Sequence, residues 1–317
     1  MNAHELTAYI KAEALRLGFD ACGVARAQQV SASVQQIYLR GINAGYVADM
    51  DYLRRNEEMR FNPTLLVPGT QSIICVAMNY YPSRPLDDST YQLAWYAYGQ
   101  DYHTVVKNRL QQLMQQIRQA CPNADGRCFC DTAPVMEKYW AEQAGLGWRG
   151  RHTQLIIKGL GTTFFLGEIF LNQELEYDTP LTQGCGSCRK CQEACPTHAL
   201  CDDEETHHPM LDARKCLSYQ TIENHGQLSD EARSAMGNCI YGCDKCQQAC
   251  PHNHTPHPTT EVLFQPSEAL LSMKPCDWQN LTVEQYRQLF KGSAVKRAKY
   301  EGLKRNIEAV EELRCKN

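Results

Sequence analysis

Long apolar segments are missing from this sequence, and so is any strong excess of positive charge. No stretch approaches about 18 uninterrupted apolar residues, which excludes a transmembrane helix. The first residues hold no basic segment followed by an apolar run, so we expect no secretory signal. The net charge is −4 over 317 residues, and any contact with a nucleic acid must therefore come from a local basic patch.

Low-complexity segments are also missing, and the internal repeats reduce to a pair of cysteine runs. Cysteine itself is abundant, with 17 residues. In a small secreted protein this would indicate disulfides, but this chain is long and its cysteines have the spacing of metal ligands. We therefore predict reduced thiols and a cytoplasmic protein. The length favours two domains, and a hydrophobic content of 43% supports a sizeable core.

The two cysteine runs predict iron–sulfur clusters. The first, residues 185–196, has the pattern C-x2-C-x2-C-x3-C-P, and the second, residues 243–251, repeats part of it as C-x2-C-x3-C-P. The first spacing is typical of a loop folded around a [4Fe–4S] cube, and its fourth cysteine reaches a second cube in two-cluster ferredoxins. Two runs therefore predict two clusters that exchange electrons. Zinc bound by two C-x2-C pairs is the alternative, but the longer spacing is far more particular.

The exchange of the last cysteine between the runs predicts the ligands of each cluster. One set is Cys185, Cys188, Cys191 and Cys250. The other set contains Cys195, Cys243, Cys246 and one further cysteine. The candidates for this last position are Cys201, Cys216 and Cys239, of which spacing favours Cys239.

Hydrophobic periodicity predicts helices and strands in alternation ahead of the cysteine region. Helices are expected over 3–18, 31–44, 47–56, 101–120 and 136–144, and strands over 21–25, 72–78, 127–131 and 162–171. The alternation predicts an α/β domain over residues 1–178. Residues 179–258 have the short elements of a ferredoxin-like module. Residues 259–317 form a helical C-terminal segment, with helices over 259–272, 282–291 and 294–314.

Four segments make the sequence resemble the epoxyqueuosine reductase family, at residues 94–103, 131–138, 211–223 and 237–246. Because the chain stops at Asn317, it resembles the short form without C-terminal helical repeats. The resemblance implies an oxidoreductase that uses cobalamin and two [4Fe–4S] clusters. Such an enzyme reduces the epoxide of epoxyqueuosine, at the tRNA wobble position, to queuosine. The resemblance also implies Cys216, in place of Cys239, as the last cluster ligand, and it makes the first domain a corrinoid-binding one.

Asp131 is the candidate proton donor. Removing an epoxide oxygen requires two electrons and a proton for the leaving oxygen, so the protein must present an acid. Asp131 ends a predicted strand, and a carboxyl in such a partly dry place is expected to have a raised pKa. Its alternative role is to cap a helix that starts near Pro134. The resemblance favours catalysis, because the corresponding aspartate of the family is its proton donor.

The resemblance also implies contacts with the corrinoid. The matching residues are Arg60, Ala94, Asp131, Leu155, Leu166, Ser218, Lys245 and Cys246. Taken alone, Arg60 would form a surface ion pair and the two leucines would be plain core residues. Tyr102 and His103 lie beside a helix start, and we assign neither as a cobalt ligand, because the family binds cobalamin without a protein histidine on cobalt.

A basic segment, residues 291–306, predicts contact with tRNA. Six basic residues and one acid give it a local charge of +5. A solvated helix face is the alternative, but the resemblance favours RNA. The candidate contacts are Lys296, Arg297, Lys304 and Arg305. We further expect an external electron donor of the flavodoxin or ferredoxin type, a monomer, and no association with a membrane.

Three other functions compete with this interpretation. A corrinoid and iron–sulfur reductive dehalogenase of a small molecule shares the cofactors, but the basic segment and the missing twin-arginine signal speak against it. A simple ferredoxin-like electron carrier would not need about 178 residues ahead of its clusters. A zinc-stabilised RNA-binding module would be colourless, whereas a protein with [4Fe–4S] clusters is brown.

Overall fold

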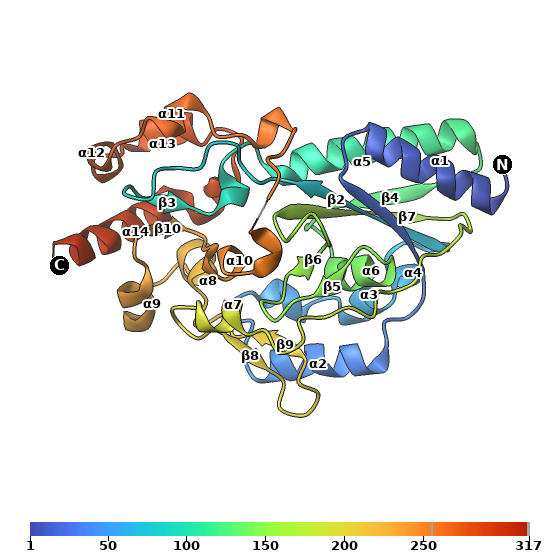
Figure 1. Ribbon diagram of the computed structural model, residues 1–317, viewed down its shortest axis with the longest axis horizontal. Helices are drawn as coiled ribbons and strands as arrows, with labels where there is room; N and C mark the ends of the chain where they lie inside the picture. Colours follow the sequence, from blue (N-terminus) through green and yellow to red (C-terminus); the bar gives the residue numbers. More distant parts are fainter. Residues whose placement is uncertain (255, 316–317) are drawn as a thin grey trace.

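The computed structural model describes residues 1–254 and 256–315 (Figure 1). Its largest sheet has four strands in the order β1-β2-β7-β4, with every neighbouring pair antiparallel. Their bounds are Ala21–Arg26, Ser72–Asn79, Phe164–Leu171 and Gly126–Phe129. Each predicted strand is confirmed to within two residues. The mixed helix and strand organisation is also confirmed, although successive strands pair antiparallel, so the placement of Asp131 cannot rest on the rule for parallel sheets.

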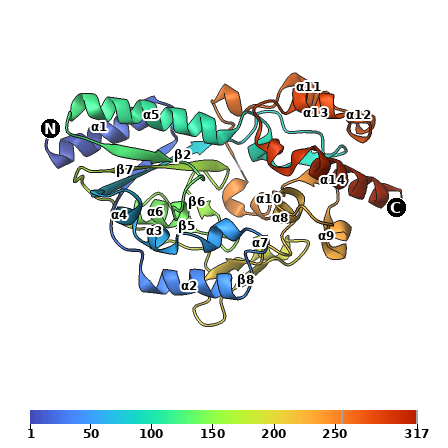
Figure 2. The same ribbon diagram turned by 180° about the vertical axis from the view of Figure 1, so that it is seen from behind.

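Helices cover both faces of this sheet (Figures 1 and 2). Helices α1 (Ala3–Arg16) and α5 (Tyr102–Ala120) lie on one face, and α6 (Glu137–Gln143) lies on the other. Side chains of a strand alternate between the two faces. On β7, Phe165 and Ile169 accordingly join the core under α1 and α5, whereas Phe164 and Phe170 join the core under α6.

Helix α5 begins next to the candidate active site. The Asp101 side chain caps it by accepting the N–H of His103, so Tyr102 and His103 form its first turn. Gly167 on β7 faces this helix, and a Cβ at that position would lie 2.9 Å from Leu110. Glycine therefore permits the close packing that brings the first turn of α5 to the residues after β4.

Shorter elements surround the face that carries α6. They are α2 (Ala32–Asn43), a 3-10 helix η1 (Asp51–Arg54), α3 (Glu57–Phe61), α4 (Pro63–Leu66), β5 (Trp148–Arg149) and β6 (Leu155–Ile156). The helix expected over residues 47–56 is wrong. Ala48 and Asn56 both have positive φ, at 50° and 56°, and each interrupts a right-handed helix.

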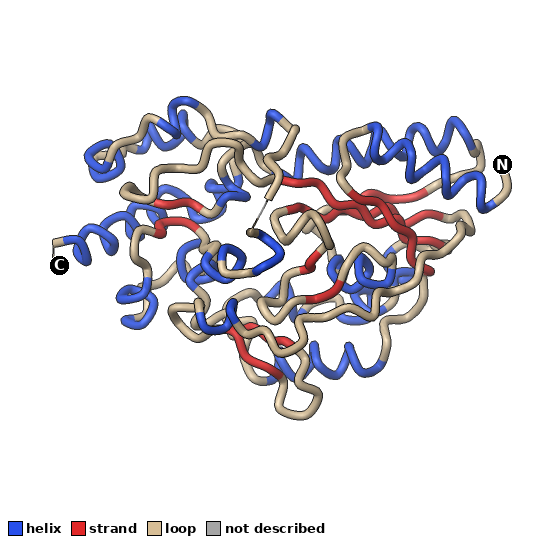
Figure 3. The backbone as a smooth tube through the Cα atoms, in the orientation of Figure 1, coloured by secondary structure: helices blue, strands red, loops and turns tan. Residues whose placement is uncertain are grey.

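The cysteine region consists of short elements, as predicted (Figure 3). Each cysteine run contains a four-residue helix, α7 (Lys190–Glu193) in the first and α10 (Lys245–Gln248) in the second, and the two helices pack against each other. The remaining elements are the hairpin β8 (Leu200–Asp202) and β9 (Pro209–Leu211), α8 (Leu217–Ile222), α9 (Asp230–Ala235) and β10 (Cys239–Tyr241).

The C-terminal part is helical, with α11 (Glu268–Leu271), α12 (Pro275–Gln279), α13 (Val283–Leu289), the 3-10 helix η5 (Ala294–Ala298) and α14 (Lys299–Arg314). Its core also takes residues from the first part of the chain. Strand β3 (Gln92–Leu93) pairs in parallel with β10, and Tyr91 packs against Trp278. The domain boundaries at 178 and 258 stay predictions. Within the described residues no helix has the length and apolar content needed to cross a bilayer.

Candidate active site and cluster-binding region

Asp131 lies in the loop that follows β4, with a φ of 52°, a value that is uncommon outside glycine. Its Oδ2 accepts the O–H of Tyr102 and lies 3.7 Å from Nε2 of His103. Its own N–H donates to Oε1 of Glu137, at 2.5 Å. Side chains of α5 therefore hold the carboxyl of Asp131, and a side chain of α6 holds its backbone N–H. Such strained positions concentrate at functional sites.

The helix-capping alternative for Asp131 is wrong. Helix α6 begins at Glu137, and its N-cap is Met136, which makes no side-chain cap hydrogen bond. The Asp131 side chain is instead 58% exposed and directed at the first turn of α5. An exposed carboxyl that is fixed by its neighbours is available to a ligand.

The charges around Asp131 correct the expected direction of its pKa. Burial acts to raise the pKa of Asp131, but the hydrogen bonds with His103 and Tyr102 outweigh it and lower the pKa below its usual value. Burial acts to lower the pKa of His103, but its carboxylate partners Asp101 and Asp131 raise that pKa to about 9. His103 therefore carries the proton of this pair at neutral pH.

Tyr102 is held rigidly by its neighbours. Its ring stacks on Phe165, with centroids 4.3 Å apart and planes 2° apart, and on His103 at 4.0 Å. The sequence drew attention to Tyr102 and His103 only as possible cobalt ligands. Their contact with Asp131 depends on the packing of α5 across β7, which no local pattern reports.

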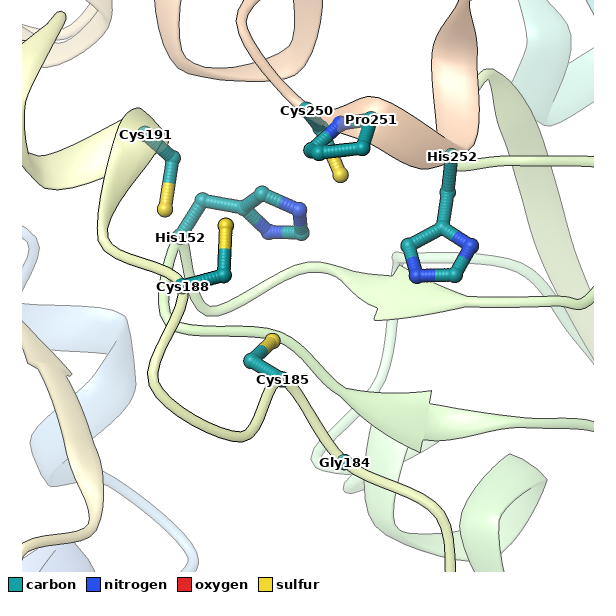
Figure 4. Close-up of a pocket in the computed structure, with 8 residues that line it drawn as sticks. All are labelled: His152, Gly184, Cys185, Cys188, Cys191, Cys250, Pro251 and His252. Atoms are coloured by element: carbon teal, nitrogen blue, oxygen red, sulfur yellow. The ribbon is translucent and has the colours of Figure 1, made fainter.

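The first cysteine set lines one cavity of about 80 Å³ (Figure 4). The sulfur atoms of Cys185, Cys188, Cys191 and Cys250 turn toward the same space, and the imidazoles of His152 and His252 also border it. Cys250 comes from the second run, as the exchange rule predicts. Four sulfur donors around one space suit an iron–sulfur cube.

The second set lies around α10. Burial raises the pKa of Cys246, and the thiols of Cys216 and Cys195 raise it further, so both lie near Cys246. Cys239 instead interacts with Cys243, and that hydrogen bond lowers the pKa of Cys239. No three Cys, His, Asp or Glu side chains in residues 1–254 and 256–315 are close enough to hold one metal ion. A cube is larger than one ion and spreads its thiolates over separate irons.

Arg60 is not part of a surface ion pair. It is buried, with 8% of its surface exposed, and its Nη2 donates to the backbone oxygen of Tyr52 at 3.3 Å. Its guanidinium lies over the ring of Tyr38 at 5.6 Å, while its Nε has no partner among the described residues. A buried, unpartnered donor of this kind suits a polar ligand group, so Arg60 fits a corrinoid contact.

The other candidate corrinoid contacts fall into two groups. Leu155 and Leu166 belong to the core under α6, on the side of the sheet near Arg60. Ala94, Ser218, Lys245 and Cys246 lie around α8, β10 and α10. In this second group the N–H of Ala94 donates to Tyr241, and the Lys245 ammonium donates to the backbone oxygen of Ala235.

Three of the four candidate RNA contacts in the basic segment are engaged with the protein itself. Arg297 forms an ion pair with Glu223 at 2.7 Å, and the Lys304 ammonium donates to the backbone oxygen of Gln279. The Arg305 guanidinium donates to backbone oxygens of residues 220, 224 and 226. Lys296 is exposed. The exposed positive charge is therefore smaller than the sequence indicates.

Comparison with known proteins identifies the chain. A family model described as epoxyqueuosine reductase QueG, DUF1730, matches residues 60–132, and a model of a 4Fe-4S double cluster binding domain matches residues 184–253. The epoxyqueuosine reductase of Leadbetterella byssophila is 41% identical over 304 residues, which are 96% of this chain and 98% of that relative. The chain belongs to the epoxyqueuosine reductase family. The resemblance seen in the sequence and the pair of iron–sulfur clusters are thereby confirmed.

Solved structures of the family have the same fold. An epoxyqueuosine reductase with an epoxyqueuosine-modified tRNA-Tyr stem loop matches at a TM-score of 0.87 and 25% identity, over 98% of this chain and 81% of that one. The enzyme from Bacillus subtilis, with the loop of its catalytic aspartate swung out of the active site, matches at 0.87 and 25% identity, over 98% and 82% of the two chains. The predicted fold class is confirmed.

Proposed function

We propose that this chain reduces the epoxide of epoxyqueuosine in tRNA to the alkene of queuosine, with Asp131 as proton donor. The observation that carries the proposal is the geometry of Asp131 in a chain of this family. Its carboxyl is exposed, held by Tyr102 and His103, and placed in a strained loop. A relative with the same fold has the loop of its catalytic aspartate swung out of its active site, which supports a mobile acid here as well.

The chemistry sets what the protein must supply. Two C–O bonds of the epoxide break, a C=C bond forms, and the oxygen leaves as water, which consumes two electrons and two protons. The double [4Fe–4S] domain supplies a path for the electrons. Cobalamin, when bound, would supply a reduced metal centre for the transfer of these electrons to the substrate. Arg60, with its buried and unpartnered Nε, is the residue best suited to hold cobalamin. The seven other residues that match the family's corrinoid contacts are proposed to line the same site.

Asp131 and His103 together account for proton delivery. His103 keeps its proton at neutral pH, because its pKa is raised to about 9 by its carboxylate partners despite burial. It lies 3.7 Å from the carboxyl of Asp131, which is ionised at neutral pH, and it can pass its proton to that carboxyl for delivery to the substrate. Tyr102 fixes the carboxyl through its O–H. Proton donor, proton source and positioning group thus come from one turn of α5 and the loop after β4.

The RNA side of the proposal rests on the basic segment. A relative binds an epoxyqueuosine-modified tRNA stem loop, and Lys296 and Arg297 are exposed on η5. Lys304 and Arg305 complete the predicted set, although both already donate to backbone oxygens. The flavodoxin-type or ferredoxin-type donor, the monomeric state and the cytoplasmic location stay predictions from the sequence.

Mass spectrometry of the wobble nucleoside tests the function. Chemically reduced, cluster-loaded protein is incubated anaerobically with cobalamin and tRNA that carries epoxyqueuosine. We expect a product lighter by one oxygen, formed only when both cobalamin and reductant are present. An unchanged nucleoside under these conditions, with both clusters intact, would refute the proposal.

A further inference from the structure

A carboxyl group is buried in the middle of the main sheet. Glu168 lies on β7 with none of its surface exposed, and its backbone pairs with Cys75 on β2 and Phe129 on β4, which are also buried. Its strand position directs the side chain to the same face as Phe164 and Phe170, under α6. Neither carboxyl oxygen accepts a hydrogen bond from an N–H or O–H donor of the described residues, and the side-chain hydrogen-bonding contact that it does make is with the carboxyl of Glu137. Glutamate is almost never found fully buried without a partner, so this position requires an explanation.

The group that approaches Glu168 is a second carboxyl, that of Glu137 on α6. Burial first, then the charges of Glu137 and Asp131, raise the pKa of Glu168 far above its ordinary value. Burial and the charge of Asp131 also raise the pKa of Glu137 to about 8. Two adjacent carboxyls in an apolar place do not both ionise, and one of them keeps a proton. The fully buried Glu168 is the one that keeps it.

The remaining groups around the pair come from each element packed against it. They are His103 of α5, Asp131 and Cys130 of the loop after β4, Lys138 of α6, and Cys75 of β2. The cations His103 and Lys138 act on Glu137 but not on Glu168, whose charged neighbours are Glu137 and Asp131. Among the residues that the structure describes, Glu168 therefore has no neighbouring cation that would stabilise its ionised form.

We propose that Glu168 is a positioning residue for catalysis: its carboxyl retains a proton and donates a hydrogen bond to the carboxyl of Glu137, which in turn accepts the N–H of Asp131. The chain Glu168–Glu137–Asp131 is then a latch that holds the catalytic loop inward. This inference rests on the proposed function, because it presupposes Asp131 as the acid. The latch uses the shortest contact of the Asp131 backbone, at 2.5 Å.

The latch explains why the strand tolerates a glutamate. A leucine at this position would satisfy the apolar face at lower cost, since burying a carboxyl is unfavourable. A neutral glutamic acid, however, supplies an O–H donor on the sheet that orients the Glu137 carboxyl of the covering helix α6. When the pH rises far enough for Glu168 to ionise, two carboxylates face each other and the latch opens.

Two variants of the holoenzyme, Glu168→Gln and Glu168→Leu, separate the latch from a packing role. The Gln amide donates to Glu137 and cannot ionise, so we expect turnover at pH 7 close to that of the unmodified enzyme and no loss of the latch at high pH. The Leu side chain offers no donor. Loss of one buried hydrogen bond corresponds to about a tenfold fall in the latched population.

The measurements are hydrogen–deuterium exchange of the peptide that spans residues 130–137 and the pH profile of turnover, with iron content as the check of folding. We expect about tenfold weaker protection of this peptide in Glu168→Leu at pH 7. In Glu168→Gln we expect protection and turnover to persist to higher pH than in the unmodified enzyme. Unchanged protection and pH profile in both variants would overturn the inference, and so would an equal loss in both.

Asp131→Asn, measured alongside, separates the two proposals. If that variant keeps full turnover, the acid role fails whatever the latch does. If it loses turnover while the Glu168 variants behave as the unmodified enzyme, the latch alone fails. The exchange data remain informative in either case, because they follow the loop and not the reaction.

Discussion

Replacing Asp131 by asparagine removes the carboxyl that passes the His103 proton to the substrate, and it leaves the size of the side chain unchanged. Asn has the same size, accepts the Tyr102 O–H through its amide oxygen, and tolerates the φ of 52° better than most residues. Alanine would add backbone strain at this φ and would therefore confuse the result. The loop and the Glu137 contact of the Asp131 N–H should thus be preserved.

The expected effect is a fall of about 10²–10⁴ in the single-turnover rate, the usual contribution of a positioned acid. In free energy this is about 3–5 kcal/mol of lost transition-state stabilisation. The assay is rapid quenching of pre-reduced, cobalamin-loaded enzyme with epoxyqueuosine-containing tRNA, with the wobble nucleoside quantified by mass spectrometry. Iron and cobalamin contents should match those of the unmodified enzyme.

A matched control is Asp125→Asn, which makes the same chemical change at an exposed carboxylate paired with Arg118. It should leave the rate unchanged. A rate for Asp131→Asn within about threefold of the unmodified enzyme would refute the acid role, since general acids contribute far more than that. An equal loss in both variants would point to a general effect of charge.

Three further predictions concern the clusters and the RNA. Two cubes require about eight irons per chain, and Cys216→Ser should lose about half of them while Cys239→Ser keeps all, as counted by anaerobic metal analysis; the reverse would restore Cys239 as the ligand. Lys296→Ala combined with Arg297→Ala should weaken tRNA binding and make it less dependent on salt. The slope of log binding constant against log salt concentration should fall in magnitude by about 0.7–0.9 for each phosphate that the variant no longer neutralises. An unchanged slope would mean that neither residue contacts RNA. Arg305→Ala should instead lower the thermal unfolding midpoint by about 5 °C, because buried backbone oxygens lose their donor, and a loss of RNA affinity at unchanged stability would contradict this structural role.

Local patterns in the sequence were sufficient for most secondary structure. The four strands of the main sheet and the long helices were predicted because their periodicity is set by neighbours in the chain. The failure over residues 47–56 came from Ala48 and Asn56, whose positive φ values end a helix without any change in hydrophobic pattern. The antiparallel pairing also lay beyond local reasoning, because alternating helices and strands do not fix the direction in which strands pair.

The tertiary structure changed the view of single charged residues. The sequence alone assigned no role to Glu168, although glutamate seldom occupies the middle of an apolar strand. The direction of the Asp131 pKa was wrong, because His103 approaches it from a helix that begins 29 residues earlier in the chain. The sequence predicts Arg305 as an RNA contact, and the structure adds that its guanidinium donates to three backbone oxygens.

The sequence by itself determined the iron–sulfur chemistry and the family, because cysteine spacing and the family segments are local features of the chain. Asp131 became the candidate acid through the resemblance, since its position at a strand end fitted a helix cap equally well. Only the tertiary structure decided that Tyr102 and His103 meet Asp131, and that Glu168 lies in the core under α6, the helix that carries Glu137. Each of these depends on side chains from elements far apart in the chain. Their meeting is set by how helices pack on the two faces of one sheet, and no spacing of residues encodes that distance.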